Sequence, residues 1–255
     1  MSPPLLQSTA VASLMLLVCA PAYAQSSAPD EERPITSGLE IGFRSGHADR
    51  GFLLSDRPVI QPVAWLSRDR AEFSAWSNFT LVETTDGARP EILELELTRE
   101  FVWRDLSIAP ALRMYFYRDP LSPFSTRSLE SWWYLSYDLG PLRLFTNHSL
   151  DVLTYRGAYF GDAGIESEQQ LLDRIAIGGS LGAGWASAAF NDSYVGVAKS
   201  ALNHVNAKGW VTAYVTDRLY IGPYFELNAT LDRSVRAEHI QPTYFLVGVA
   251  IGGDF

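Results

Sequence analysis

The chain has 255 residues, a formal net charge of −9 at pH 7 and a single cysteine, Cys19. The acidic balance and the lack of a basic stripe argue against a nucleic-acid partner. One cysteine excludes a disulfide framework and a thiolate metal site from the rest of the chain. Beyond residue 24 no apolar run is long enough for a transmembrane helix.

Residues 1–24 have the pattern of a cleaved secretory signal peptide. Residues 11–20 form a short apolar core, and residues 22–24 give the small-x-small sequence that precedes a cleavage site. No Lys or Arg precedes the core, which departs from the usual pattern. We expect residues 25–37 to be a polar, disordered periplasmic leader and residues 38–255 to form one folded domain.

From residue 38 onward, apolar side chains recur at every second position. Residues 93–103, 106–117 and 219–231 show this period most clearly. Strict alternation predicts β-strands with one apolar and one polar face. The folded domain is therefore expected to be all-β.

The connections between these strands are of two kinds. Six long loops and five short turns alternate along the chain, which predicts twelve strands with both termini on the turn side. This layout is typical of an antiparallel up-and-down transmembrane β-barrel in the outer membrane of a Gram-negative bacterium. A secreted β-sandwich, the alternative, has less need of such alternation. The expected turns are 67–70, 103–105, 138–141, near 186–193 and 216–218, and the expected long loops are 45–57, 83–89, 118–127, 156–172, 200–207 and 232–242.

The last strand stays apolar on one face up to an aromatic terminus. In a closed barrel this strand pairs with the first, so every backbone polar group in hydrocarbon is satisfied. A final strand of this kind also resembles the C-terminal signal by which barrel-assembly machinery recognises bacterial outer-membrane proteins. The residues of this expected signal are Phe245, Val247, Val249, Ile251 and Phe255.

One stretch near the start of the domain resembles a known family. Residues 50–61 contain Arg50-Gly51, Ser55-Asp56, Pro58 and Gln61, and this pattern is similar to a signature of the TorF family of outer-membrane porins. The family usually has an aromatic residue before Arg-Gly, where this chain has Asp49.

Two further stretches carry weaker similarities. Residues 73–81 resemble the next strand of the same family, and residues 190–197 are similar to a stretch of MipA/OmpV-type barrels. Either resemblance implies a small outer-membrane barrel without a defined substrate.

Candidate chemistry is weak in this sequence. In residues 146–150, His148 and Ser149 are adjacent, so on a strand they point to opposite faces and cannot share a proton. The Gly-rich residues 178–185 lack the Gly-Lys-Ser/Thr of a phosphate loop. Asp162 and the other acidic residues of the expected loops fit solvated loop charge. We predict no catalytic residue, no cofactor and no metal.

The inward face of the barrel is the expected functional surface. Rings of acidic side chains favour cations or polar uncharged solutes, so we predict a monomeric, porin-like channel for their passive diffusion, narrowed by the inward folding of residues 156–172. Its other expected partners are outer-membrane lipids and lipopolysaccharide. The alternatives are a non-conducting scaffold that binds a periplasmic or cell-wall partner and, third, an outer-membrane hydrolase. The expected lumen residues are Glu72, Glu94, Glu96, Glu100, Arg113, Arg143, Asp151 and Glu226.

Overall fold

The structure, a computed structural model, describes residues 35–81, 92–117, 126–239 and 241–255. The expected signal peptide and most of the expected leader lie outside these residues. No helix in the described part of the chain is long and apolar enough to cross a membrane. The elements are β1 Thr36–Arg44, β2 His47–Asp49, β3 Phe52–Ser55, β4 Val59–Arg68, β5 Ala71–Thr80, β6 Ile92–Arg99, β7 Phe101–Trp103, β8 Leu106–Tyr117, β9 Thr126–Leu139, β10 Leu142–Asp151, β11 Tyr159–Leu172, β12 Ile175–Ala186, α1 Ala188–Val195, β13 Ala201–Tyr214, β14 Leu219–Thr230, α2 Arg233–Ala237 and β15 Thr243–Asp254.

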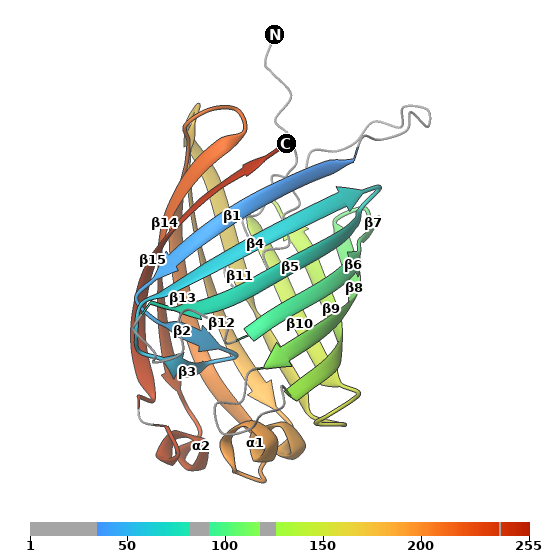
Figure 1. The fold of residues 1–255 in the computed structure, drawn as a ribbon, viewed down its shortest axis with the longest axis vertical. Helices are drawn as coiled ribbons and strands as arrows, with labels where there is room; N and C mark the ends of the chain where they lie inside the picture. The colour runs from blue at the N-terminus through green and yellow to red at the C-terminus, as the bar shows by residue number, and fades with distance from the viewer. Residues whose placement is uncertain (1–34, 82–91, 118–125, 240) are drawn as a thin grey trace.

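The strands form a closed antiparallel barrel (Figure 1). β1 pairs with β15 from Gly38↔Asp254 to Arg44↔Gly248, and every other wall strand pairs with its neighbours in sequence. β6 and β7 both pair with β8, so they are two halves of one strand. The described residues thus make a barrel of twelve strands, which confirms the predicted fold class.

The two ends of the barrel differ, as expected. The turn rim carries the short connections after β4, β7, β9, β11 and β13, and both termini of the barrel lie there (Figure 1). The loop rim carries the six longer connections, two of which include α1 and α2. The expected loops 83–89 and 118–127 fall wholly or largely outside the described residues.

Strands β11 to β13 lie elsewhere than predicted. Residues 159–172 form β11 and residues 201–214 form β13, so the expected loops 156–172 and 200–207 are mostly strand. The expected turn near 186–193 instead belongs to a loop-rim connection that contains α1. The number of strands is right because two misplaced loops and one misplaced turn compensate for one another.

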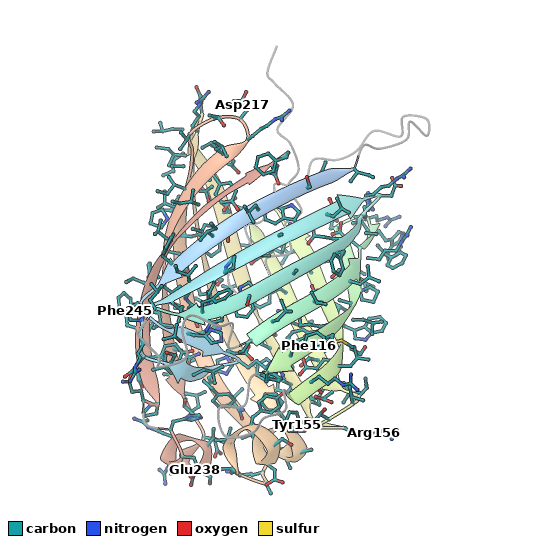
Figure 2. The ribbon with its side chains drawn as sticks, in the orientation of Figure 1. Phe116, Tyr155, Arg156, Asp217, Glu238 and Phe245 are labelled. Carbon is teal, nitrogen blue, oxygen red and sulfur yellow. The ribbon has the colours of Figure 1, made fainter. Side chains whose placement is uncertain are left out.

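The barrel wall is apolar outside and polar inside. Side chains such as Phe245 project away from the wall (Figure 2). A sheet that closes on itself has no free edge, and its apolar outer face suits lipid. Every strand of the wall contributes an exposed apolar side chain, for example Leu39, Leu66, Phe73, Leu97, Leu112, Trp133, Leu144, Ile165, Leu181, Val205, Phe225 and Val247.

A small apolar core lies inside the loop rim. Phe52 of β3, Phe190 of α1 and Val235 of α2 are buried in one cluster with Phe160 of β11. Ser187 caps α1 by accepting a hydrogen bond from the Phe190 backbone amide. Three connections that are distant in sequence therefore hold one another in place within the mouth of the barrel.

Candidate functional site

The first long loop folds into the lumen as the β2–β3 hairpin (Figure 1). Arg50 and Gly51 form its tip and have positive φ angles of 48° and 86°. Gly51 is required for a second reason, since an added Cβ would lie 2.3 Å from Nδ1 of His204. The segment that folds inward is thus residues 47–55. The prediction from the sequence, residues 156–172, was wrong.

The hairpin reaches across the lumen. It leaves the wall between β1 and β4, and β10 lies opposite β1 in the ring of strands. Its tip residue Arg50 contacts β8, β9 and β11, which flank that opposite side. Near its base, Ala48 packs with Tyr244 and Leu246 of β15. The hairpin therefore occupies the middle of the barrel rather than one wall.

Arg50 is fixed by a carboxylate and a phenol. Its Nη2 donates to Glu130 Oε2 and to the Tyr115 hydroxyl, each at 2.8 Å. Trp132 Nε1 also donates to Glu130 Oε2, at 2.8 Å, and Tyr194 donates to Glu130 Oε1 at 3.3 Å. Burial alone would lower the pKa of Arg50, but Glu130 first, then Tyr115, Asp49 and Tyr194, raise it well above its ordinary value. The guanidinium stays charged in a buried site.

Aromatic rings surround the same guanidinium. Its Cζ lies 5.3–5.9 Å from five ring centroids. Cations at this distance from a ring are attracted by the negative face of its π system, more strongly when water is excluded. The five rings belong to Tyr115, Trp132, Phe160, Phe190 and Tyr194.

The family-like motif maps onto this hairpin and its base. Arg50 and Gly51 are the tip, and Ser55 accepts a hydrogen bond from the Arg57 amide where the chain leaves β3. Gln61 Nε2 donates to Asn78 at 2.9 Å and lies 3.1 Å from Nδ1 of His47. Pro58 accepts from the Leu81 amide, and Asp56 is exposed. The resemblance therefore singled out residues of this hairpin and its base, but it did not predict that the hairpin folds into the lumen.

A second buried arginine lies in the wall on β8 and, like Arg50, donates to the Tyr115 hydroxyl. Arg113 Nε lies 2.7 Å from Glu96, its Nη1 lies 3.6 Å from Glu94, and its Cζ lies 4.2 Å from the ring centroid of Trp132. It also donates to the Tyr134 hydroxyl. Glu94, Glu96 and Arg113 were expected inside the lumen, and the structure places them there as one network.

The other expected lumen residues lie in separate groups. Arg143 pairs with Asp138 at 2.8 Å and Glu166 at 3.6 Å. Glu226 pairs with Arg44 at 2.8 Å and lies 3.9 Å from Lys208. Glu72 is buried on the inner face of β5.

Two expected lumen residues have local structural contacts. Glu100, half-buried between β6 and β7, accepts a hydrogen bond from Ser107. Asp151 accepts from the backbone amides of Leu153 and Tyr155 and from Ser128, so it caps a loop-rim turn.

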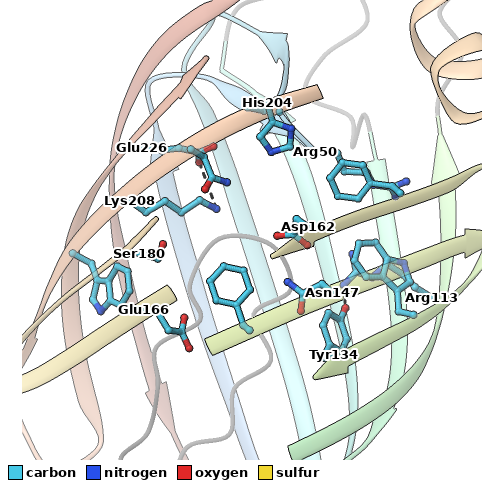
Figure 3. A pocket seen from close by; sticks show the side chains of 17 residues that line it. Arg50, Arg113, Tyr134, Asn147, Asp162, Glu166, Ser180, His204, Lys208 and Glu226 are labelled. Carbon is cyan, nitrogen blue, oxygen red and sulfur yellow. Dashed lines mark hydrogen bonds and ion pairs between the residues drawn. The ribbon is translucent and has the colours of Figure 1, made fainter. Parts of the chain in front are cut away.

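The hairpin separates two cavities. The inner cavity, about 110 Å³, lies against β8–β14 and is lined by charged, polar and aromatic side chains (Figure 3). The outer cavity, about 450 Å³, lies toward the loop rim, beside His239 and Tyr194. Ala48 and Arg50 line both. Any path along the lumen between these cavities passes the hairpin.

Asp162 was misassigned by the sequence. It was expected in a loop, but β11 carries it into the inner cavity, beside its register partner Asn147 of β10 (Figure 3). Lys208 of β13, which lines the same cavity, interacts electrostatically with its carboxylate. The alternation that identifies a strand was weak here because β11 has glycine and polar residues on both faces.

The adjacent His148 and Ser149 do point apart. Ser149 is buried, on the same face as Asn147 of the inner cavity. His148 contacts Thr146 and Tyr159 on the other face of the wall. Within the described residues, no three His, Cys, Asp or Glu side chains are grouped to hold a metal ion.

Solved structures share this architecture. A structure described as KdgM porin superposes with a TM-score of 0.51, covering 86% of this chain and 99% of that chain at 9% identity. The chain has a porin-like fold. A NanC porin structure gives a TM-score of 0.50 at 12% identity, with 86% and 98% covered. No protein-family model and no curated protein matches the chain, so the resemblance to TorF-family porins stays a prediction.

Proposed function

We propose that the chain forms a passive channel for small polar solutes, with a preference for cations, in the outer membrane of a Gram-negative bacterium. The observation that carries the proposal is a closed barrel with an apolar outer face and a charged lumen. Twelve strands lie between small filled barrels and the wide porins. We expect a monomer, in contact with outer-membrane lipids and lipopolysaccharide.

The preference for cations rests on the charges inside the barrel. Among the described residues, eight carboxylates and three guanidinium groups are buried. An excess of acidic groups around a pore favours cations. The carboxylates belong to Glu40, Glu72, Glu94, Glu96, Glu130, Asp151, Glu166 and Glu226, and the guanidinium groups to Arg44, Arg50 and Arg113.

Conductance of the refolded chain 25–255 in a planar bilayer tests the proposal. We expect discrete steps and a reversal potential in a salt gradient that indicates cation preference. Asp162→Asn removes a carboxylate of the inner cavity and leaves the positive charge of Lys208 there, so this preference should fall. Asp217→Asn, on an exposed residue of the turn rim, is the control (Figure 2). An equal reversal potential for wild type and Asp162→Asn would contradict the assignment of Asp162.

A non-conducting barrel is the second candidate, because the hairpin fills the middle of the lumen. In that case the folded protein gives a silent bilayer, and its function rests on a periplasmic or cell-wall partner. Capture of such a partner by the intact chain, together with a silent bilayer, would favour the scaffold over the channel.

A further inference from the structure

The surroundings of Arg50 form a cage that would remain if the arginine were withdrawn. The cage consists of Glu130, Tyr115, Trp132, Phe160, Phe190 and Tyr194. None of these residues belongs to the hairpin, since they come from β8, β9, β11 and α1. Stacking of Phe190 on Tyr194, with ring centroids 4.3 Å apart, supports the α1 side of the cage without Arg50.

The cage suits a guanidinium group better than an ammonium group. Glu130 and Tyr115 accept from one nitrogen of Arg50, while the flat group faces five rings. A guanidinium is planar and weakly hydrated, so it leaves water more readily than a compact ammonium and stacks on aromatic faces. Glu130 is itself buried, and a buried carboxylate without a cation is strongly unfavourable.

Arg50 is delivered to this cage by a segment that the barrel wall does not need. The backbone pairing of β1 with β4 ends at Arg44↔Val59, so the hairpin is not part of the barrel wall. Phe52 on the same hairpin packs 6.3 Å from Phe190, ring to ring, and 4.6 Å from His239. Side-chain contacts of this kind, with Arg50 at their centre, hold the hairpin between the two cavities.

We propose that the cage is a guanidinium-binding site, that its occupation by Arg50 latches the hairpin across the channel, and that small guanidinium-bearing solutes compete for it. The latch rests on the proposed channel function, whereas the binding site does not. Arg50 is thus an occupant of the site that the chain itself supplies, and the ligands expected to replace it carry the same guanidinium group.

Removal of the Arg50 side chain tests the binding site directly. In full-length Arg50→Ala, guanidinium chloride at millimolar concentration should raise the temperature at which the folded barrel converts to the unfolded form on a gel. Ammonium chloride at equal ionic strength should raise it much less. Arg57→Ala removes an exposed arginine just beyond the same hairpin and should show no selective effect of guanidinium.

Two further variants keep the binding test decisive. Adding Glu130→Gln to Arg50→Ala should abolish the guanidinium effect, because the cage loses its carboxylate. If Arg50→Ala alone does not fold, Arg50→Lys supplies a poorer occupant, and guanidinium should still stabilise it selectively. No selective stabilisation of either Arg50 variant would overturn the site.

Single-channel conductance tests the latch. Arg50→Ala should conduct several-fold more than wild type, and Arg57→Ala should match wild type. Equal conductance of Arg50→Ala and wild type would overturn the latch while the thermal result still decides the site. If neither protein conducts, the proposed channel function fails, and guanidinium stabilisation then identifies a binding site in a closed barrel.

Discussion

Arg113 is the residue on which the wall network of β6, β8 and β9 depends. Its side chain is fully buried and bridges Glu94, Glu96, Tyr134 and the Trp132 ring. Removing one partner of a buried ion pair leaves an uncompensated charge. The two carboxylates would then lie close together with no cation between them.

Arg113→Met should therefore lower the free energy of unfolding by about 3–5 kcal/mol. Urea-dependent tryptophan fluorescence of the refolded barrel measures this loss. The matched variant Arg174→Met breaks the exposed pair with Asp217, whose partners lie 3.5 Å apart, and should cost less than about 1 kcal/mol. Equal effects of the two substitutions would mean that burial does not set the strength of the Arg113 network.

His239 makes the packing of the hairpin sensitive to acid. It stacks on Phe52, and burial lowers its pKa from the ordinary 6.5, with the adjacent Glu238 offsetting part of this effect. An imidazole released from the stack regains the ordinary value, so protons bind the undocked form preferentially. The contribution of this contact is complete above pH 6.5 and decreases as the pH falls below it.

Conductance should accordingly rise on acidification below pH 6.5. His239→Gln should flatten this rise, and His148→Gln, on the other face of the wall, should leave it unchanged. An identical pH profile for wild type and His239→Gln would contradict the role of this histidine.

The β2–β3 hairpin fills the middle of the lumen without being part of the barrel wall. Replacing residues 46–56 by a short Gly-Ser linker leaves every pair between β1 and β4 intact. The shortened protein should still show the heat-dependent gel shift of a folded barrel, and its conductance should exceed that of wild type. The control Leu54→Ser alters an exposed hairpin residue. Loss of the gel shift in the shortened protein alone would show that the wall needs the hairpin.

The last strand carries the expected assembly signal. Phe255 lies outward, and its backbone exchanges hydrogen bonds with Ser37, of 2.8 and 3.3 Å. Phe255→Ala keeps these backbone bonds, so refolding of the purified protein in detergent should be unaffected. Less folded barrel should reach the outer membrane of cells. Phe225→Ala, an outward substitution on β14, is the control, and equal cellular yields of the two variants would contradict the signal.

Strand β11 shows where sequence reasoning reached its limit. Its inner face carries Asp162, Gly164 and Glu166, and its outer face begins with Tyr159 and Gly161. Small residues occur on both faces, so the period of two is weak and the stretch resembles a loop. The indole of Trp185 covers Gly161, with Cε2 lying 2.7 Å from where a Cβ would be. Contacts between strands, which a linear sequence does not reveal, give this segment its structure.

At the scale of the whole molecule, the sequence predicted the wall better than the lumen. Lipid-facing alternation is a local pattern, and it predicted the fold class. The strand number was right only because the errors around β11 to β13 compensate for one another. The cage joins Arg50 to Glu130 and Tyr194, which are 80 and 144 positions further along the chain. No local pattern specifies such contacts. Arg113 with Glu94 and Glu96 was foreseeable because β6 and β8 are neighbours in sequence.

Closure of the ring between β1 and β15 also sets an order of events in time. The ring stays open until its last strand is in place, because that strand supplies the partner of the first. The hairpin follows β1 immediately, and the surfaces that receive its tip lie on β8, β9 and β11, so its docking does not require the pairing of β1 with β15. The hairpin can therefore dock while the sheet has not yet closed into a barrel. The barrel then wraps around its own first loop, and no later step has to thread Arg50 through a finished wall.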